Sequence, residues 1–179
     1  MILLKILAVV VALIALLCVI ALFVKKEYTI KREVLINNSV DKVYDYVRFH
    51  KNQPEFNQWL GFDPNTKIEI KGNEDGTPGS ILHFESNHKK TGTGEWENTH
   101  MVQNEKIELE LRFLAPYQFT ANGALYFNDV NEDRTKLIWE YNSGMDWPKN
   151  ITLLFMDMDK IIGQDIEATL EKIKLNTEK

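Results

Sequence analysis

The pattern of hydrophobic and polar positions divides this 179-residue chain into an unbroken apolar run and a longer periodic part. Residues 6–24 are apolar throughout, and at 1.5 Å per residue such a helix would span roughly 28 Å, enough for a bilayer core. A cleaved signal peptide is the alternative, but the run continues past Ala21 without a polar segment. We therefore expect an uncleaved transmembrane anchor over residues 1–26 and one soluble domain over residues 27–179.

The soluble part alternates with period two in segments that predict seven strands. These segments are residues 28–36, 67–71, 80–86, 92–102, 106–114, 119–130 and 135–141. Two short helices are predicted between the first two strands, one after the candidate N-cap Ser39 and one starting at Pro54.

The end of the chain changes to helical spacing and predicts one long helix from Trp147-Pro148 to Leu175, with Asn150 as its N-cap. Its apolar stripe consists of Ile151, Leu154, Met158, Ile162, Ile166, Leu170 and Ile173. Gly163 interrupts this helix at a cost of about 1 kcal/mol relative to Ala. Such a glycine indicates a close backbone approach, a bend or space for a ligand. The simplest arrangement is an α+β domain in which a curved seven-stranded antiparallel sheet wraps around this helix and leaves a cavity.

Several short motifs accompany this order of elements. They are FNQW at 56–59, DPN at 63–65, NHKKTGTG at 87–94, LIW at 137–139 and FMDMDKIIGQD at 155–165. Together with the apolar start, they resemble membrane-anchored bacterial members of the START/Bet v 1-like (SRPBCC, polyketide cyclase/dehydrase-like) superfamily. The resemblance implies the helix-grip fold and a hydrophobic cavity. Its members bind lipids, sterols and polyketides, and a few catalyse reactions. Where a second tryptophan is expected after Trp59, this chain has Leu60-Gly61-Phe62.

The residues expected to line the cavity are mostly aromatic or soft apolar side chains, with two polar exceptions. The candidates are Trp59, Phe84, Trp96, Asn98, Phe113, Tyr126, Trp139, Met158, Ile162, Gly163 and Asp165. Asn98 shares a strand face with Trp96 and would bind either a ligand or an ordered water. Asp165 lies near the helix stripe, either as an acid with a raised pKa or as a carboxylate paired with a lysine.

Other chemistry has weaker support in the sequence. His83, Glu85 and His88 are metal-ligand types, but no fourth ligand or second-shell partner is evident, so we expect surface polar residues and no metal. No serine stands in a nucleophile elbow, and the glycines at 92 and 94 do not precede a helix N-terminus. We expect no cofactor.

Charge and cysteine content limit the possible partners and the possible cellular location of the protein. The net charge of −5 argues against nucleic acid as a partner, because phosphates require a basic face. The only cysteine, Cys18, lies in the apolar run, so the domain has no internal disulfide. Lys25, Lys26, Lys31 and Arg32 outnumber Lys5, which predicts a single-pass membrane protein with its domain on the cytoplasmic face.

The sequence supports three hypotheses for function. The first is a membrane-tethered module that binds a hydrophobic small molecule or lipid in the cavity between sheet and helix. The second is a cyclase-like or hydrolase-like enzyme that uses Asp165, Asn98 or a cavity histidine. The third is an effector-sensing or interaction domain whose cavity is filled. A roomy apolar cavity favours the first, a converging polar pair the second, and a packed interior the third.

Overall fold

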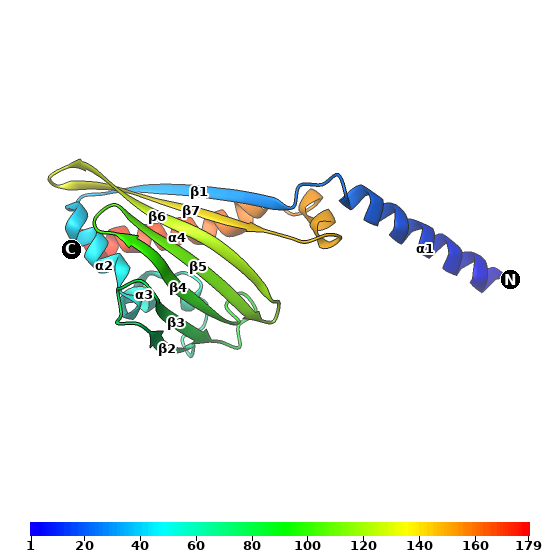
Figure 1. Cartoon of the computed structure of the whole chain (residues 1–179), viewed down its shortest axis with the longest axis horizontal. Helices are drawn as coiled ribbons and strands as arrows, with labels where there is room; N and C mark the ends of the chain where they lie inside the picture. Colours follow the sequence, from blue (N-terminus) through cyan, green and yellow to red (C-terminus); the bar gives the residue numbers. More distant parts are fainter.

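The computed structural model describes residues 1–179 and contains one seven-stranded antiparallel sheet (Figure 1). Its strands are β1 (Glu27–Ile36), β2 (Lys67–Gly72), β3 (Ser80–Glu85), β4 (Thr93–Val102), β5 (Lys106–Ala115), β6 (Phe119–Asn131) and β7 (Arg134–Gly144). They lie in the order β1-β7-β6-β5-β4-β3-β2, so the chain crosses from one edge to the other after β1 and then returns strand by strand. The seven predicted strands are confirmed, with boundaries that differ by up to three residues.

Helices cover the concave face of this sheet. The crossing between β1 and β2 carries the predicted short helices, α2 (Val40–Arg48) and α3 (Gln53–Phe56), with the 3₁₀ turns η1 (His50–Asn52) and η2 (Leu60–Phe62). The long helix α4 (Met158–Thr177) packs on the concave side, chiefly against β1. This arrangement confirms the predicted α+β architecture, a seven-stranded sheet with a long C-terminal helix.

The start of the last helix differs from the prediction. The chain forms a 3₁₀ helix, η3 (Lys149–Leu154), and then breaks before α4. Asp157 is the N-cap of α4, because its carboxylate accepts the backbone N–H of Lys160 at 3.0 Å. Leu154 is largely exposed, so the predicted apolar stripe continues only from Met158 onward.

The core lies between the concave face, α2 and α4. Its alternating strand positions include Leu82, Trp96, Leu109, Leu111, Leu125, Leu137 and Trp139, which meet Ile166, Leu170 and Ile173 of α4. All of these side chains are buried. Burial of one face of each strand explains why the strands were readable from period-two alternation.

Gly163 lies at a close approach between α4 and β1, as the sequence indicated, but its neighbour is a side chain and not backbone. Arg32 of β1 points toward α4 and pairs with Asp159 at 2.8 Å and with Glu167. These carboxylates lie four residues before and after Gly163, so the guanidinium lies across the helix at the glycine. A Cβ on Gly163 would lie 2.2 Å from Nη2 of Arg32. Gly163 therefore makes room for Arg32, and its inclusion in the cavity wall was wrong.

The apolar run forms α1 (Ile2–Ala21), which projects from one end of the sheet (Figure 1). It is exposed along nearly its whole length and is long and apolar enough to cross a membrane, a test that a signal sequence also passes. Its C-terminal end is bound by the domain. Trp147 Nε1 donates to the carbonyl of Cys18 at 3.0 Å, and Asn150 Nδ2 donates to those of Ala21 and Val24 at 2.7 and 3.0 Å. Asn150 is thus a partner of α1, and its predicted role as N-cap of the last helix was wrong.

Candidate functional site

The interior between sheet and helix is packed, in contrast to the cavity expected there. A space of about 10 Å³ remains, which is about the minimum for one water molecule. Indole rings occupy most of the volume: the centroid of Trp139 lies 5.4 Å from that of Trp96 and 5.8 Å from that of Trp59. A hydrophobic ligand of ordinary size has no room beside these rings.

A larger pocket lies at the end of the sheet where α1 leaves, and we call it the mouth pocket. Its volume is about 110 Å³. It is lined by Trp59, Lys89, Lys90, Thr91, Leu111, Phe113, Ala115, Pro116, Tyr117, Phe119, Tyr141 and Ile162. A dry protein cavity of about 150 Å³ holds benzene, so the mouth pocket is large enough for a short apolar segment.

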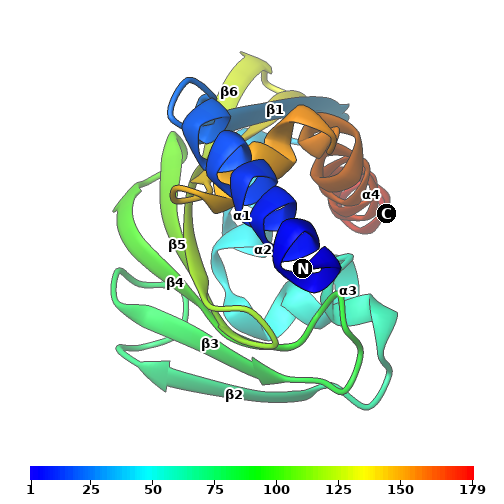
Figure 2. The ribbon, with the colours of Figure 1, turned by 90° about the vertical axis from the view of Figure 1, so that its right-hand side faces the viewer.

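Strand register brings the parts of this pocket together. Phe113 of β5 pairs with Phe119 of β6, and their rings stack with centroids 4.3 Å apart. Thr93 of β4 pairs with Ala115, and Gly144 of β7 pairs with Glu27 just after α1. The β5–β6 turn, the loop before β4 and the exit of α1 therefore lie at one end of the sheet, the end that faces the viewer in Figure 2.

The loop of residues 86–92 forms one side of the mouth pocket and is fixed at several points. Thr91 Oγ1 donates to the carbonyl of Trp59 at 2.6 Å, and Ser86 Oγ donates to Asp63 Oδ2 at 2.6 Å. Gly92 has φ +61°, and a Cβ there would lie 2.0 Å from the carbonyl oxygen of Ala115. The NHKKTGTG motif thus supplies Lys89, Lys90 and Thr91 to the wall of the mouth pocket, and Asp63 of the DPN motif holds this loop in place.

Lys90 is a cation at the edge of the mouth pocket. Its Nζ lies 3.7 Å from Asp165 Oδ2 and 4.7 Å from the centroid of the Phe62 ring. Burial raises the pKa of Asp165, and the nearby Lys90 partly offsets that effect. An acidic group on an apolar ligand would find a positive charge at this edge.

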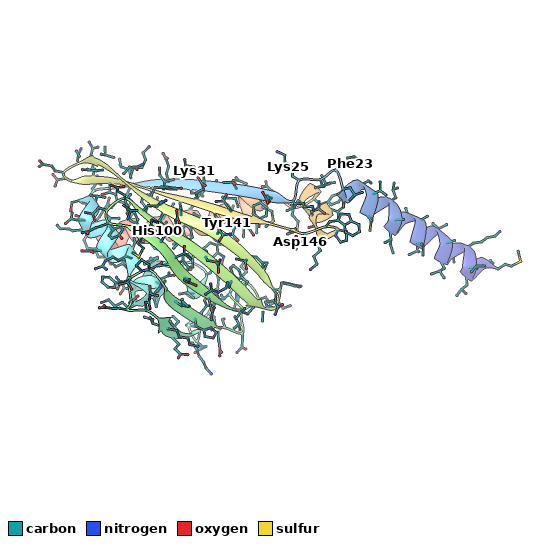
Figure 3. The ribbon with its side chains drawn as sticks, in the orientation of Figure 1. Phe23, Lys25, Lys31, His100, Tyr141 and Asp146 are labelled. Atoms are coloured by element: carbon teal, nitrogen blue, oxygen red, sulfur yellow. The ribbon has the colours of Figure 1, made fainter.

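Tyr141 is a buried polar residue of the mouth pocket, as is Thr91. Figure 3 shows it between Asp146, at the end where α1 leaves, and His100 at the other end of the sheet. Burial raises the pKa of its phenol, which therefore stays protonated and available as a donor near neutral pH.

A polar network lies behind the packed interior. Asn98 Nδ2 donates to the carbonyl of Arg48 at 3.0 Å, so its amide holds α2. His50 Nε2 lies 2.9 Å from the carbonyl oxygen of Ser80, and Gln53 Nε2 lies 3.3 Å from His50 Nδ1. Burial lowers the pKa of His50, so the ring is neutral in the folded protein. Nothing in the local pattern distinguished this buried histidine from the exposed ones.

The structure separates the predicted cavity residues into groups. Trp59, Phe113 and Ile162 line the mouth pocket, whereas Trp96, Asn98 and Trp139 line the small interior space. Phe84 is buried, with its ring edge-to-face with Phe113.

Four other candidates, like Phe84, line neither space. Tyr126 pairs with Ile138 on the convex face, because it alternates with the inward Leu125. Met158 is half-buried at the start of α4, and Gly163 faces Arg32. Asp165 pairs with Lys90 behind the pocket edge.

The mouth pocket also contains side chains that sequence reasoning missed. They are Lys89, Lys90, Thr91, Leu111, Ala115, Pro116, Tyr117, Phe119 and Tyr141. The NHKKTGTG motif contains the two lysines and Thr91, and it was the only signal for them. The others depend on strand register, which single-segment patterns do not show.

The side chains of His83, Glu85 and His88, which are of metal-ligand type, do not come together at one site. His83 Nε2 lies 3.3 Å from Glu85 Oε1 on the convex face, while His88 stacks on Phe62 in the loop. No group of three or more His, Cys, Asp or Glu side chains in the structure is placed to hold a metal ion.

No protein-family model and no curated protein matches this sequence. Solved structures do match. A Staphylococcus aureus protein of unknown function superposes with a TM-score of 0.64 at 14% identity, covering 86% of this chain and 94% of that chain. Norcoclaurine synthase from Thalictrum flavum gives 0.62 at 12% identity, with 84% and 94% covered. The Zhui aromatase/cyclase from Streptomyces gives 0.61 at 12% identity, with 85% and 94% covered. At these identities the likeness concerns the fold, and the chain has the Bet v 1-like, or SRPBCC, helix-grip fold.

Proposed function

We propose that this chain is a membrane-tethered binding module for a hydrophobic small molecule or lipid, part of which enters the mouth pocket. The observation that carries the proposal is an apolar pocket of about 110 Å³ at the same end of the domain as the exposed apolar helix α1. The fold supports it, since Bet v 1-like domains typically hold hydrophobic ligands.

The size and charge of the mouth pocket indicate the chemistry of the ligand. Four buried CH₂ groups would contribute roughly 3 kcal/mol before losses of freedom, at about 0.8 kcal/mol each. Such a segment alone binds weakly, so the rest of the ligand lies over the pocket edge. Lys89 and Lys90 are exposed there and favour an acidic head group. A fatty acid or an anionic lipid has both features.

Two observations, the contacts at the end of α1 and the basic residues after it, support α1 as a retained anchor with the domain on the cytoplasmic side. Removal of α1 would take away the Ala21 carbonyl, one of the two acceptors of the buried Asn150 amide, and the Cys18 carbonyl that accepts from the Trp147 indole. A buried polar group without a partner costs about 1–3 kcal/mol, so the domain is built to keep this helix. The cluster of basic residues just after α1 favours the cytoplasmic face.

Two tryptophan substitutions on α4 test the proposal. Ile162→Trp fills the mouth pocket, whereas Leu175→Trp adds the same side chain at an exposed site far from it. Native mass spectrometry of the full chain in lipid nanodiscs with added palmitate should show a bound fatty acid in the wild type and in Leu175→Trp. Ile162→Trp should lose it while keeping its melting temperature. Equal binding by both folded variants would refute the mouth pocket as the site.

The packed interior favours a second candidate, an interaction or effector-sensing domain with a filled cavity. Its support is the space of only about 10 Å³ between sheet and helix. The same experiment separates the two functions, because this candidate predicts no bound fatty acid in any of the three proteins.

A further inference from the structure

The helix α1 is held in a fixed direction relative to the domain. Only residues 22–26 connect it to β1, and Met145 N–H donates to the carbonyl of Lys26 at 2.8 Å within this connection. Helix ends leave carbonyls without partners, and here Trp147 and Asn150 supply donors to those of Cys18 and Ala21. A bilayer that contains α1 is therefore met by one end of the domain, the end seen in Figure 2.

That end of the domain exposes large apolar side chains, which we call the apolar rim. The rim consists of Leu114, Tyr117 and Phe119 at the β5–β6 turn, and of Leu154 at the end of η3 with Phe155 and Met156 after it. Phe155 is 82% exposed and Tyr117 78% exposed. Two exposed apolar segments thus lie at the end of the domain from which α1 leaves, and exposed apolar surface of this kind is typical of an interaction site.

The opposite end of the sheet is different in character. Its two hairpins contain Gln103-Asn104-Glu105 and Asn131-Glu132-Asp133, which are polar or acidic. The end with the apolar rim has Lys25 and Lys26 after α1, Lys149 in η3 and the pair Lys89-Lys90, with Glu27, Asp146, Asp157 and the Lys90 partner Asp165 as nearby acids. Apolar and basic side chains thus gather at the end where the apolar helix leaves.

We propose that the apolar rim rests on the surface of the bilayer that holds α1, with the basic side chains among anionic head groups, so that the mouth pocket opens onto the membrane. The inference deepens the proposed function and rests on its anchor interpretation of α1. A lipid surface is the occupant because the rim lies at the end of the domain from which the apolar helix α1 leaves, where Trp147, a residue type that favours the membrane interface, contacts the end of α1. Basic side chains beside anionic head groups favour such contact.

Site-specific fluorescence in bilayers tests this docking. In a full-length Cys18→Ala background, single cysteines replace Leu13 in α1, Phe155 in the rim or Asn131 in the far hairpin, and each is labelled with an environment-sensitive dye. The proteins are placed in nanodiscs containing anionic lipid, with and without brominated acyl chains. Brominated lipid should reduce the fluorescence at positions 13 and 155 and leave that at 131 unchanged.

Each other pattern has a definite meaning. If the dye at position 13 is quenched but the dyes at 155 and 131 are not, the rim docking is overturned and the anchor stands. No quenching at 13 overturns the anchor, and with it the tethering part of the proposed function. A dye at 155 that is shielded from aqueous iodide but not quenched by brominated lipid shows that protein covers the rim, which also overturns the inference. Binding of palmitate is measured separately, so its loss does not alter these results.

Discussion

Substitution of Gly163 by alanine tests whether this glycine makes room for the side chain of Arg32. In an ordinary helix interior, Gly→Ala stabilises by about 1 kcal/mol. Here the new Cβ would meet the guanidinium at 2.2 Å and displace it from Asp159 and Glu167. Both carboxylates are more than half exposed, so each ion pair is worth about 0.2–1 kcal/mol. Gly163→Ala should therefore lie between a gain of about 0.5 and a loss of about 1 kcal/mol.

The same substitution in an Arg32→Ala background should give the full gain of about 1 kcal/mol, because nothing then opposes the methyl group. For a chain of this size that gain raises the melting temperature by about 2–4 °C. The wild type, the two single variants and the double variant form a double-mutant cycle. Their melting temperatures are measured by near-ultraviolet circular dichroism of the full-length proteins in mild detergent. Equal effects of Gly163→Ala in both backgrounds, within about 0.3 kcal/mol, would refute the coupling.

Two further predictions concern buried polar groups. Because His50 is neutral in the fold but charges on unfolding, the unfolded state binds more protons below the ordinary pKa of 6.5. As the pH is lowered below that value, the free energy of unfolding should therefore decrease by up to about 1.4 kcal/mol per pH unit. His50→Asn should remove this slope in denaturant titrations. Asn150→Ala removes the donor to the end of α1 and should speed limited proteolysis within residues 22–26 without changing the melting temperature of the domain. An unchanged cleavage rate would show that α1 is held by other contacts.

The strands were readable from the sequence because one face of each is buried in the core. The start of α4 was not readable, because Asn150 and Asp157 are both good N-cap types. Only the position of α1 shows that the amide of Asn150 is used by another helix. The role of Gly163 was also unreadable from its local sequence, because its neighbour Arg32 belongs to β1, at the start of the domain.

The site was partly predictable for the same physical reason. Trp59, Phe113 and Ile162 stand in apolar patterns and do line the mouth pocket. Tyr117 and Phe119 lie at a turn, where composition alone indicates exposure, and their role depends on the pairing of β5 with β6. The volume of the interior also depends on how three indole rings pack, which no linear pattern specifies.

The central claim is that an apolar ligand enters the mouth pocket and not the packed interior. Isoleucine methyl groups report on both places in one NMR spectrum, because Ile162 lines the mouth pocket while Ile107 and Ile173 line the interior space. Titration of octanoate into the full chain in lipid nanodiscs should shift the Ile162 methyl resonance to saturation and leave those of Ile107 and Ile173 in place. Shifts at Ile107 and Ile173, or no change at Ile162, would contradict the account.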